Sequence, residues 1–263
     1  MAKIFPMFSG SEGNATYIGA DDFAVLIDVG VSYKRISESL YAANLSPDKI
    51  DAVLITHEHA DHIKGLKTFL KHHSVPVIAS RETIYALEYA KIINYESPRI
   101  YIDECDEYTI GSAQIKRFPT SHDCVGSSGY TVTLSDGVKL AVCTDLGIVT
   151  DEVRQALKGS RVVMLESNHD PVMLRLGPYP PELKIRISSE KGHLSNAVCA
   201  ETVAYLYENG ADRFILAHIS EKNNTAEKAS SAVRAALIDK GATENSDYIL
   251  YVAEKEGSRV ITI

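Results

Sequence analysis

The chain has 263 residues, of which 45% are hydrophobic and 24% charged, and its formal net charge is -8 at pH 7. A chain of this length can bury roughly three-quarters of its unfolded surface, which is enough for one core without covalent staples. No apolar stretch approaches the roughly 20 residues of a membrane span, and the first residues lack the apolar core of a secretion signal. We therefore expect one domain over residues 1–263, no membrane contact and a cytoplasmic location.

Strand and helix patterns alternate along the chain without a linker or an internal repeat. Apolar runs typical of strands occupy residues 23–29, 50–56, 75–79, 130–134, 138–144, 161–166, 213–217, 248–253 and 259–263. A helix is predicted over residues 195–208, and Asn224 followed by Glu227 predicts a capping box that opens a helix reaching Leu237. This alternation indicates a layered α/β architecture.

The four cysteines are widely spaced and form no CxxC pair. Disulfide frameworks and thiolate zinc sites both need closer or paired cysteines. We therefore expect Cys105, Cys124, Cys143 and Cys199 to be reduced thiols.

A cluster of possible metal ligands follows the apolar run at residues 52–55. Within six positions lie His57, His59, Asp61 and His62. Neutral imidazole and carboxylate are ligands suited to zinc, manganese or iron, and a strand that leads into a loop delivers them to one point. His57 and His59 can face the same ion because one residue separates them. Asp61 and His62 begin a helix-like stretch, so a second ion could be held alongside.

Further polar residues follow other apolar runs, in the order Asp28, His122, Asp145 and His218. In α/β folds, the loops after strands are the usual place for a site. Together with the motif His57-x-His59-x-Asp61-His62, this order resembles the metallo-β-lactamase superfamily over almost the whole chain. The resemblance implies a four-layer αβ/βα sandwich, with two sheets inside and helices outside, and a centre of two divalent metal ions.

The resemblance also assigns the ligands. One ion would take His57, His59 and His122, the other would take Asp61, His62 and His218, and Asp145 would bridge both because a carboxylate has two oxygens. Asp28 would orient a ligand loop by hydrogen bonds from outside the ligand set. The ions expected are zinc, manganese or iron.

The segment Gly192-His193-Leu194-Ser195-Asn196 narrows the chemistry. It is similar to a short histidine-containing element in the phosphodiesterase branches of the superfamily, where an extra histidine faces the scissile phosphate. His193 would then protonate the leaving oxygen, because expelling an alkoxide from phosphorus is otherwise slow. We count Asp61 and His193 as candidate catalytic residues.

Five short segments, at residues 8–14, 121–123, 166–170, 192–196 and 220–224, resemble the YycJ/WalJ branch. That branch consists of single-domain bacterial proteins associated with 5′-to-3′ DNA exonuclease activity. The glycine-rich segment 8–14 could approach a phosphate, but a hairpin turn explains it equally well. The chain has no room between His122 and Asp145 for the long arm of tRNA 3′-processing enzymes. Asp145 also stands where the commonest class B β-lactamases carry cysteine.

The net charge of -8 opposes a nucleic-acid substrate, although a global count does not locate the charges. Residues 175–193 are locally positive. The candidate substrate contacts are His169, Tyr179, Lys184 and Arg186, with tyrosine able to stack on a base. A turn around His169 and a solvated loop with a packed tyrosine are the alternatives.

The sequence thus predicts a binuclear metal-dependent phosphodiesterase, a DNA exonuclease that needs no obligate protein partner. A lactone or thioester hydrolase that uses the same metals on a carbon centre is the alternative enzyme. A non-catalytic metal-binding scaffold is the third hypothesis, which the full ligand set and the extra histidine disfavour.

Overall fold

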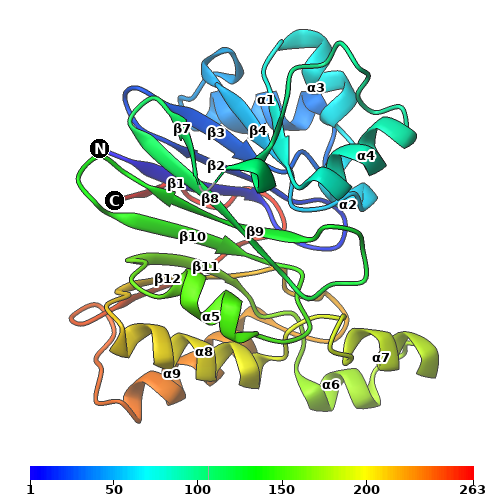
Figure 1. Cartoon of the computed structure of the whole chain (residues 1–263). Coiled ribbons are helices and arrows are strands. Elements are labelled where there is room, and N and C mark those ends of the chain that lie inside the picture. Colours follow the sequence, from blue (N-terminus) through cyan, green and yellow to red (C-terminus); the bar gives the residue numbers. More distant parts are fainter. Residues whose placement is uncertain (106) are drawn as a thin grey trace. The chain divides into compact units, whose positions relative to one another are not determined.

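The computed structural model describes residues 1–105 and 107–263. The chain divides into two compact units, and most of their helices and strands are labelled in Figure 1. The first unit comprises Met1–Arg117, Cys124–Ser128 and Glu254–Ile263, and the second comprises Phe118–Asp123 and Gly129–Ala253.

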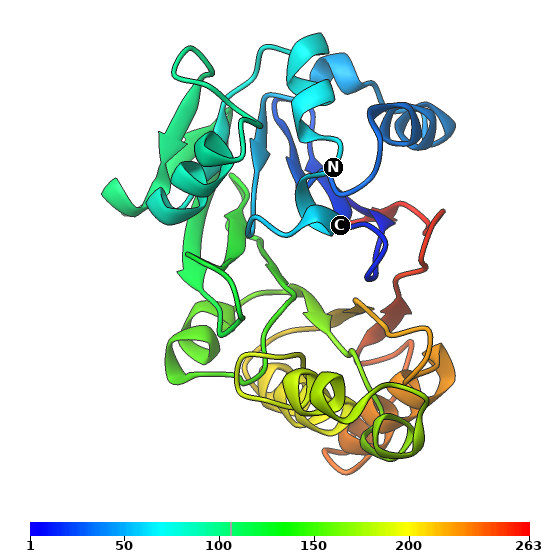
Figure 2. The same ribbon diagram turned by 90° about the vertical axis from the view of Figure 1, so that its right-hand side faces the viewer.

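The first unit is built on a seven-stranded sheet with the order β14-β1-β2-β3-β4-β5-β6. Its strands are β1 (Lys3–Phe8), β2 (Ala15–Gly19), β3 (Ala24–Ile27), β4 (Ala52–Leu54), β5 (Val77–Ala79), β6 (Arg99–Tyr101) and β14 (Ile261–Thr262). Strands β1 to β3 run antiparallel, whereas β3 to β6 run parallel. Lys3 pairs with Thr262, so the two ends of the chain lie side by side on this sheet (Figure 2).

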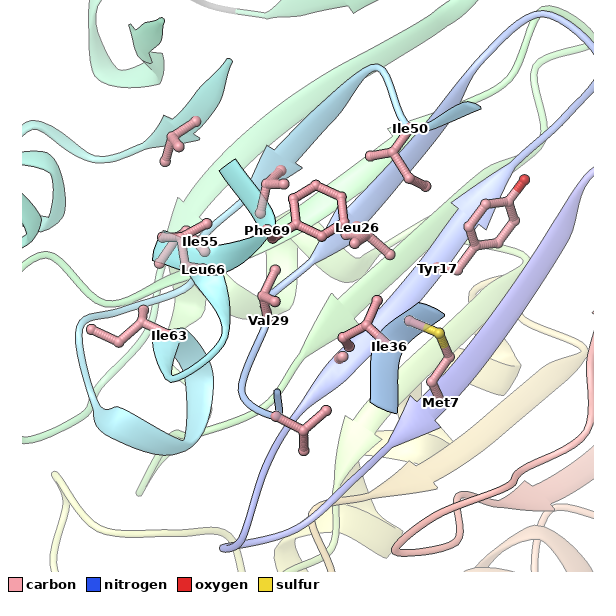
Figure 3. Packing of buried hydrophobic residues seen from close by; sticks show 14 of the residues in the cluster. Met7, Tyr17, Leu26, Val29, Ile36, Ile50, Ile55, Ile63, Leu66 and Phe69 are labelled. Carbon is pink, nitrogen blue, oxygen red and sulfur yellow. The ribbon is translucent and has the colours of Figure 1, made fainter. Parts of the chain in front are cut away.

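Helices pack on this sheet because each has one apolar face. They are α1 (Tyr33–Ala42), α2 (Ala60–Ile63), α3 (Leu66–His72) and α4 (Arg81–Tyr89), with 3-10 turns η1 (Pro47–Lys49) and η2 (Ile102–Glu104). Ile36 of α1 and Leu66 and Phe69 of α3 are fully buried in one apolar cluster with Leu26 of β3 (Figure 3). This packing holds α2 and the turn before it close to the ends of β3 and β4.

The second sheet has the strand order β13-β12-β11-β10-β9-β8-β7. Its strands are β7 (Tyr108–Ile110), β8 (Ala113–Pro119), β9 (Ser128–Thr133), β10 (Lys139–Cys143), β11 (Val162–Glu166), β12 (Arg213–Ala217) and β13 (Ile249–Val252). Strands β10 to β13 are parallel, with Cys143 opposite Leu165 and Leu165 opposite Leu216. Their carboxyl ends therefore share one edge of the sheet.

The helices of the second unit cover an apolar core of its own. They are α5 (Asp151–Leu157), α6 (Pro171–Leu176), α7 (Pro181–Ile187), α8 (Asn196–Glu208) and α9 (Ala226–Ile238). Helix α8 packs against α9 and buries Val203 and Leu206, which join Phe214 of β12 in the core. The predicted helix at residues 195–208 is confirmed, with the Ser195 hydroxyl capping its first turn.

The predicted capping box at Asn224 is wrong by one residue. Helix α9 is capped by Thr225, whose hydroxyl accepts a hydrogen bond from Lys228 N at 3.1 Å. Asn224 is instead buried in a reciprocal amide pair with Asn196, at 2.7 and 2.8 Å. Asparagine and threonine are both good caps, so only the tertiary partner of Asn224 decides between them.

Several strands lie outside the predicted apolar runs. Strands β1 and β2 are almost fully buried and so show no alternation, while β6 and β7 have three residues each, too few for a period. The loop between β1 and β2 is the turn that the glycine-rich segment predicted as one alternative. The cysteines are free, as expected. Within the described ranges, no helix is long and apolar enough to cross a membrane.

Candidate metal centre

The histidine-rich segment of the first unit forms the turn between β4 and α2. His57 and His62 are fully buried, whereas Asp61 keeps 27% of its side chain exposed. The ring centroid of His57 lies 4.6 Å from that of His59 and 4.0 Å from that of His62. The turn therefore gathers three imidazoles beside a carboxylate that solvent can reach.

Asp28, at the end of β3, anchors this turn. Its carboxylate accepts hydrogen bonds from Thr56 N at 2.9 Å, Thr56 Oγ1 at 2.8 Å and His62 Nδ1 at 2.8 Å. Burial raises the pKa of the Asp28 carboxyl, and the neighbouring His62 and Thr56 offset part of this rise. A proton held on Nδ1 by this hydrogen bond fixes the tautomer of His62 and leaves the acceptor lone pair of the ring on Nε2.

Asn14 is a neighbour of the turn to which the sequence assigned no role. It is buried at the end of the loop between β1 and β2, with its Nδ2 atom 3.0 Å from His62 Nε2 and 3.4 Å from Asp61 Oδ2. Its backbone N–H also donates to Asp61 O at 2.8 Å. Its amide therefore holds two of the proposed ligands in place, and the only sequence signal was its position in the glycine-rich segment.

In the second unit, three acidic or histidine side chains follow three adjacent parallel strands. Asp145 follows β10, Glu166 ends β11 and His218 follows β12. Together with His193, from the loop before α8, they offer ligand atoms that all lie within 4.8 Å of one another. All but His193 are buried. The shared edge of the parallel strands thus creates a cluster of metal-binding type.

Three of the site residues predicted from the sequence have a left-handed backbone conformation, with φ of 63° at Asp28, 60° at Asp145 and 54° at His218. This region is costly for residues with a Cβ atom and persists where the surrounding structure imposes it. Each of the three lies within two residues of the end of a buried strand.

Glu166 belongs to this cluster of the second unit, although sequence reasoning assigned it no role. It is fully buried, and its Oε1 atom accepts hydrogen bonds from His193 Nδ1 at 2.8 Å and His218 Nδ1 at 2.7 Å. Its Oε2 atom accepts from Leu146 N at 3.2 Å and Leu194 N at 3.0 Å. Burial alone would raise the pKa of this carboxyl, but the two imidazoles outweigh burial and lower it below its usual range. The available signal was a glutamate at the end of a buried apolar strand.

His122 is held in the same way by a backbone carbonyl. Its Nδ1 atom lies 3.1 Å from Gly192 O, and its Nε2 atom lies 4.0 Å from Asp145 Oδ1. Burial lowers the pKa of His122, and the charge of Asp145 offsets this in part. A neutral imidazole with Nδ1 engaged is the form that binds metal through Nε2.

The predicted substrate contacts lie in and around α6 and α7. Lys184 Nζ donates to Arg175 O at 2.9 Å, and Arg186 forms two hydrogen bonds with the carboxylate of Asp123. Tyr179 is half-buried in the loop between the two helices. His169 is buried, burial lowers its pKa, and its Nδ1 atom has no hydrogen-bond partner among the described residues.

The donor set fits a divalent metal. In each unit the donors are imidazole nitrogens and carboxylate oxygens, which suit ions such as zinc, manganese or iron. His62, His122 and His218 each engage Nδ1 with a carboxylate or a backbone carbonyl, which is the usual support of a metal-binding histidine. No thiol belongs to these clusters as the structure describes them.

This fold and these donors define a metal-binding α/β protein, and the chain belongs to the beta-lactamase superfamily, whose domain model matches residues 24–219. The solved metallo-β-lactamase fold protein YhfI from Bacillus subtilis is similar, with a TM-score of 0.71 at 13% identity over 99% of this chain and 98% of that one. The predicted fold class is thereby confirmed.

Within the superfamily, the chain falls in the YycJ/WalJ branch. It is 36% identical over 234 residues to Exodeoxyribonuclease YycJ of Bacillus anthracis, covering 89% of this chain and 88% of the relative. It is 35% identical over 223 residues to Exodeoxyribonuclease WalJ of Streptococcus pneumoniae, covering 84% of this chain and 82% of the relative. The branch predicted from the sequence is confirmed.

Proposed function

We propose that this protein is a metal-dependent phosphodiesterase that shortens DNA from its 5′ end. Two relatives that match more than four-fifths of the chain carry the name exodeoxyribonuclease. The observation that carries the chemistry is the position of His193, whose Nδ1 atom lies 2.8 Å from the buried carboxylate of Glu166. That contact prepares an imidazole for proton transfer, which phosphodiester cleavage needs and metal storage does not.

We further propose that two divalent ions, zinc, manganese or iron, are held by the ligand sets of the superfamily pattern. His57, His59 and His122 would hold one ion, Asp61, His62 and His218 the other, and Asp145 would serve both. When bound, such ions neutralise charge on the phosphate oxygens and lower the pKa of a nucleophilic water. Asp28 and Glu166 would keep His62 and His218 oriented through their Nδ1 atoms, and the Asn14 backbone N–H would hold Asp61 through its carbonyl oxygen.

His193 and Asp61 are the proposed catalytic residues. The His193 side chain keeps 16% of its surface exposed, so its Nε2 edge can meet a substrate while Nδ1 stays on Glu166. In its protonated form, His193 would give a proton from Nε2 to the oxygen that leaves phosphorus. The Glu166 carboxylate would stabilise the charged imidazole, which makes Glu166 a positioning residue.

For the DNA strand, the proposed contacts are His169, Tyr179, Lys184 and Arg186. Arg186 and Lys184 already have partners in Asp123 and the Arg175 carbonyl, so phosphate would have to compete with these contacts. The exposed positions of Arg186 and Arg175 make that exchange accessible. Tyr179 would stack on a base.

The test uses DNA labelled at either end, incubated after reconstitution with zinc, manganese or iron. We expect linear DNA with a 5′-phosphate to be shortened from that end, and closed circular single strands to resist, because an end must be seated before cleavage. Linearised circles, or digestion only from 3′ ends, would exclude this polarity and leave the metal site intact. Assays with RNA strands of the same sequence show whether the protein prefers DNA or RNA.

The alternative function is hydrolysis of a lactone or thioester with the same metals. The names of the relatives and the acid at His193 favour the phosphodiesterase. Parallel assays with DNA, a nitrophenyl phosphodiester and acyl substrates separate the two. A preference for the acyl substrates by several orders of magnitude in kcat/KM would replace our assignment.

A further inference from the structure

A row of lysines follows the histidine turn along one face of the helical segment. Lys64 joins α2 to α3 with right-handed helical backbone, and Lys67 and Lys71 lie three and seven residues further on. Spacings of three and four place side chains on the same face of a helix. All three lysines are exposed. The row begins two residues after His62 and extends for about 10 Å along the helix axis.

The row ends at a surface hollow of about 760 Å³ between α3 and the loop that follows α4. Helices α3 and α4 are labelled in Figure 1. Its charged and aromatic lining residues are Lys67, Lys71, Glu88, Lys91, Tyr95 and Arg99. Lys67 Nζ donates to Lys91 O at 2.9 Å, which connects α3 to that loop. The hollow therefore collects lysines from two separate segments of the first unit.

The charges in this hollow do not balance internally. Arg99 pairs with Glu88 at 3.1 Å, and Glu88 is the one carboxylate among the lining residues that the structure describes. Within the described part of the chain, the ammonium groups of Lys71 and Lys91 have no ion pair. Three lysine charges thus lie together on a chain whose formal net charge is -8. Gathered like charges repel, and a polyanion relieves that repulsion.

An exposed aromatic side chain borders the same hollow. Tyr95 has 81% of its surface exposed, and its hydroxyl donates to Glu96 Oε1 at 3.1 Å. A ring in solvent beside lysines matches the way single strands are held, with bases stacked on aromatics and phosphates met by cations. A duplex, whose bases are stacked inside, would not use such a ring.

We propose that Lys67, Lys71, Lys91 and Tyr95 bind the backbone and one base of a single DNA strand outside the metal centre. This inference rests on the proposed exonuclease function and adds a second contact region to it. Lys64 is left out because it does not line the hollow. The lysines bind phosphates without sequence preference, as a nuclease that moves along a strand requires.

The experiment replaces the three lysines together, as Lys67→Gln, Lys71→Gln and Lys91→Gln. The matched control carries Lys34→Gln, Lys49→Gln and Lys158→Gln, three exposed lysines elsewhere, so both variants change the net charge equally. Both are assayed on a single strand of roughly 30 nucleotides, longer than the roughly 4–16 that one binding fold covers, and on a nitrophenyl phosphodiester.

For the triple variant we expect KM on the long strand to rise at least about tenfold, with kcat and the small substrate unchanged. The slope of log affinity against log salt should fall by about 2, since each phosphate contact on a single strand contributes about 0.7. Tyr95→Ala should lower the affinity for the strand roughly tenfold, because one base loses its stacking partner. The control should match the unmodified protein.

The outcomes distinguish this inference from the proposed function. If the unmodified protein cuts DNA while the triple variant and the control share one KM and one salt slope, the inference is overturned and the function stands. If the unmodified protein neither binds nor cuts DNA with any of the metals, both fall. The pair Lys71→Gln and Lys91→Gln keeps the Lys67 hydrogen bond, so the same KM effect in a fully folded variant supports a direct contact.

Discussion

At the residue level, one carboxylate oxygen of Glu166 serves two imidazoles. His193 and His218 both place Nδ1 within hydrogen-bond distance of Oε1, while Oε2 faces two backbone N–H groups. A neutral side chain cannot satisfy all four donors. The buried charge of Glu166 therefore connects a proposed proton donor to a proposed metal ligand.

Replacing Glu166 with glutamine tests this connection. The amide NH₂ must face either the imidazoles or the backbone N–H groups, and in both cases donors meet donors. We expect metal affinity and kcat on DNA each to fall by about 10- to 100-fold. Metal analysis and single-turnover rates measure the two effects. Glu227→Gln, at an exposed position in α9, is the matched control, and equal behaviour of the two variants would contradict the role of Glu166.

His193 and His218 share Glu166 but should differ in what they do. His193→Ala should retain metal and lose about 10²- to 10⁴-fold in rate on DNA, with a smaller loss on a nitrophenyl phosphodiester whose leaving group needs little protonation. His218→Ala should lose metal and both activities together. Metal content and rates on both substrates provide the comparison. Metal loss in His193→Ala would make His193 a ligand, and equal rate losses would argue against proton donation.

At the level of secondary structure, Asp170 links the segment that carries His169 to α6. Its carboxylate accepts from Met173 N at 2.8 Å as the helix cap and from Lys228 Nζ of α9 at 3.3 Å. Burial alone would raise the pKa of Asp170, but the Met173 N–H, followed by Lys228, lowers it overall. His169, immediately before it, is thereby attached to two helices.

Asp170→Ala should destabilise the protein by about 1 kcal/mol at pH 7 through loss of the cap. Because the folded pKa is depressed, this contribution is complete above the unfolded value of about 3.9 and is lost as the pH falls through the folded pKa. Urea unfolding from pH 7 down to about pH 3 should show the difference shrink. Asp170→Asn keeps an equally good cap, so its free energy of unfolding should fall less than that of Asp170→Ala. The difference from the unmodified protein should depend little on pH. A constant difference for Asp170→Ala over this range would contradict the account.

At the level of the whole molecule, side chains of the metal-binding type are present in both compact units. The donors come from the ends of buried strands and from the turn before α2, where the cores of the units hold the backbone. Metal that binds only the folded chain must then stabilise that folded state by mass action.

Adding zinc or manganese at about 100 times its dissociation constant should raise the free energy of unfolding by about 2.7 kcal/mol. Thermal unfolding should show this as a rise of about 2–4 °C for each kcal/mol. A chelator should reverse the rise, and His62→Ala should reduce it. An unchanged melting temperature with zinc, manganese and iron would show that the donors do not bind these ions.

The sequence alone determined the metal-binding character of the chain, because His57, His59, Asp61 and His62 lie within one turn and need no distant partner to be brought together. The α/β alternation and the helix at residues 195–208 were also predictable from the sequence, since both depend on local periodicity.

Only the tertiary structure decided which distant side chains support the ligands. Asp28 and His62 are 34 residues apart, and Glu166 and His218 are 52 apart, yet each pair is hydrogen-bonded. Their contact follows from the register of parallel strands, which the packing of a whole core selects. The role of Glu166, the buried amide pair of Asn224 and the meeting of Lys67 with Lys91 all depend on such long-range packing, which local sequence periods do not encode.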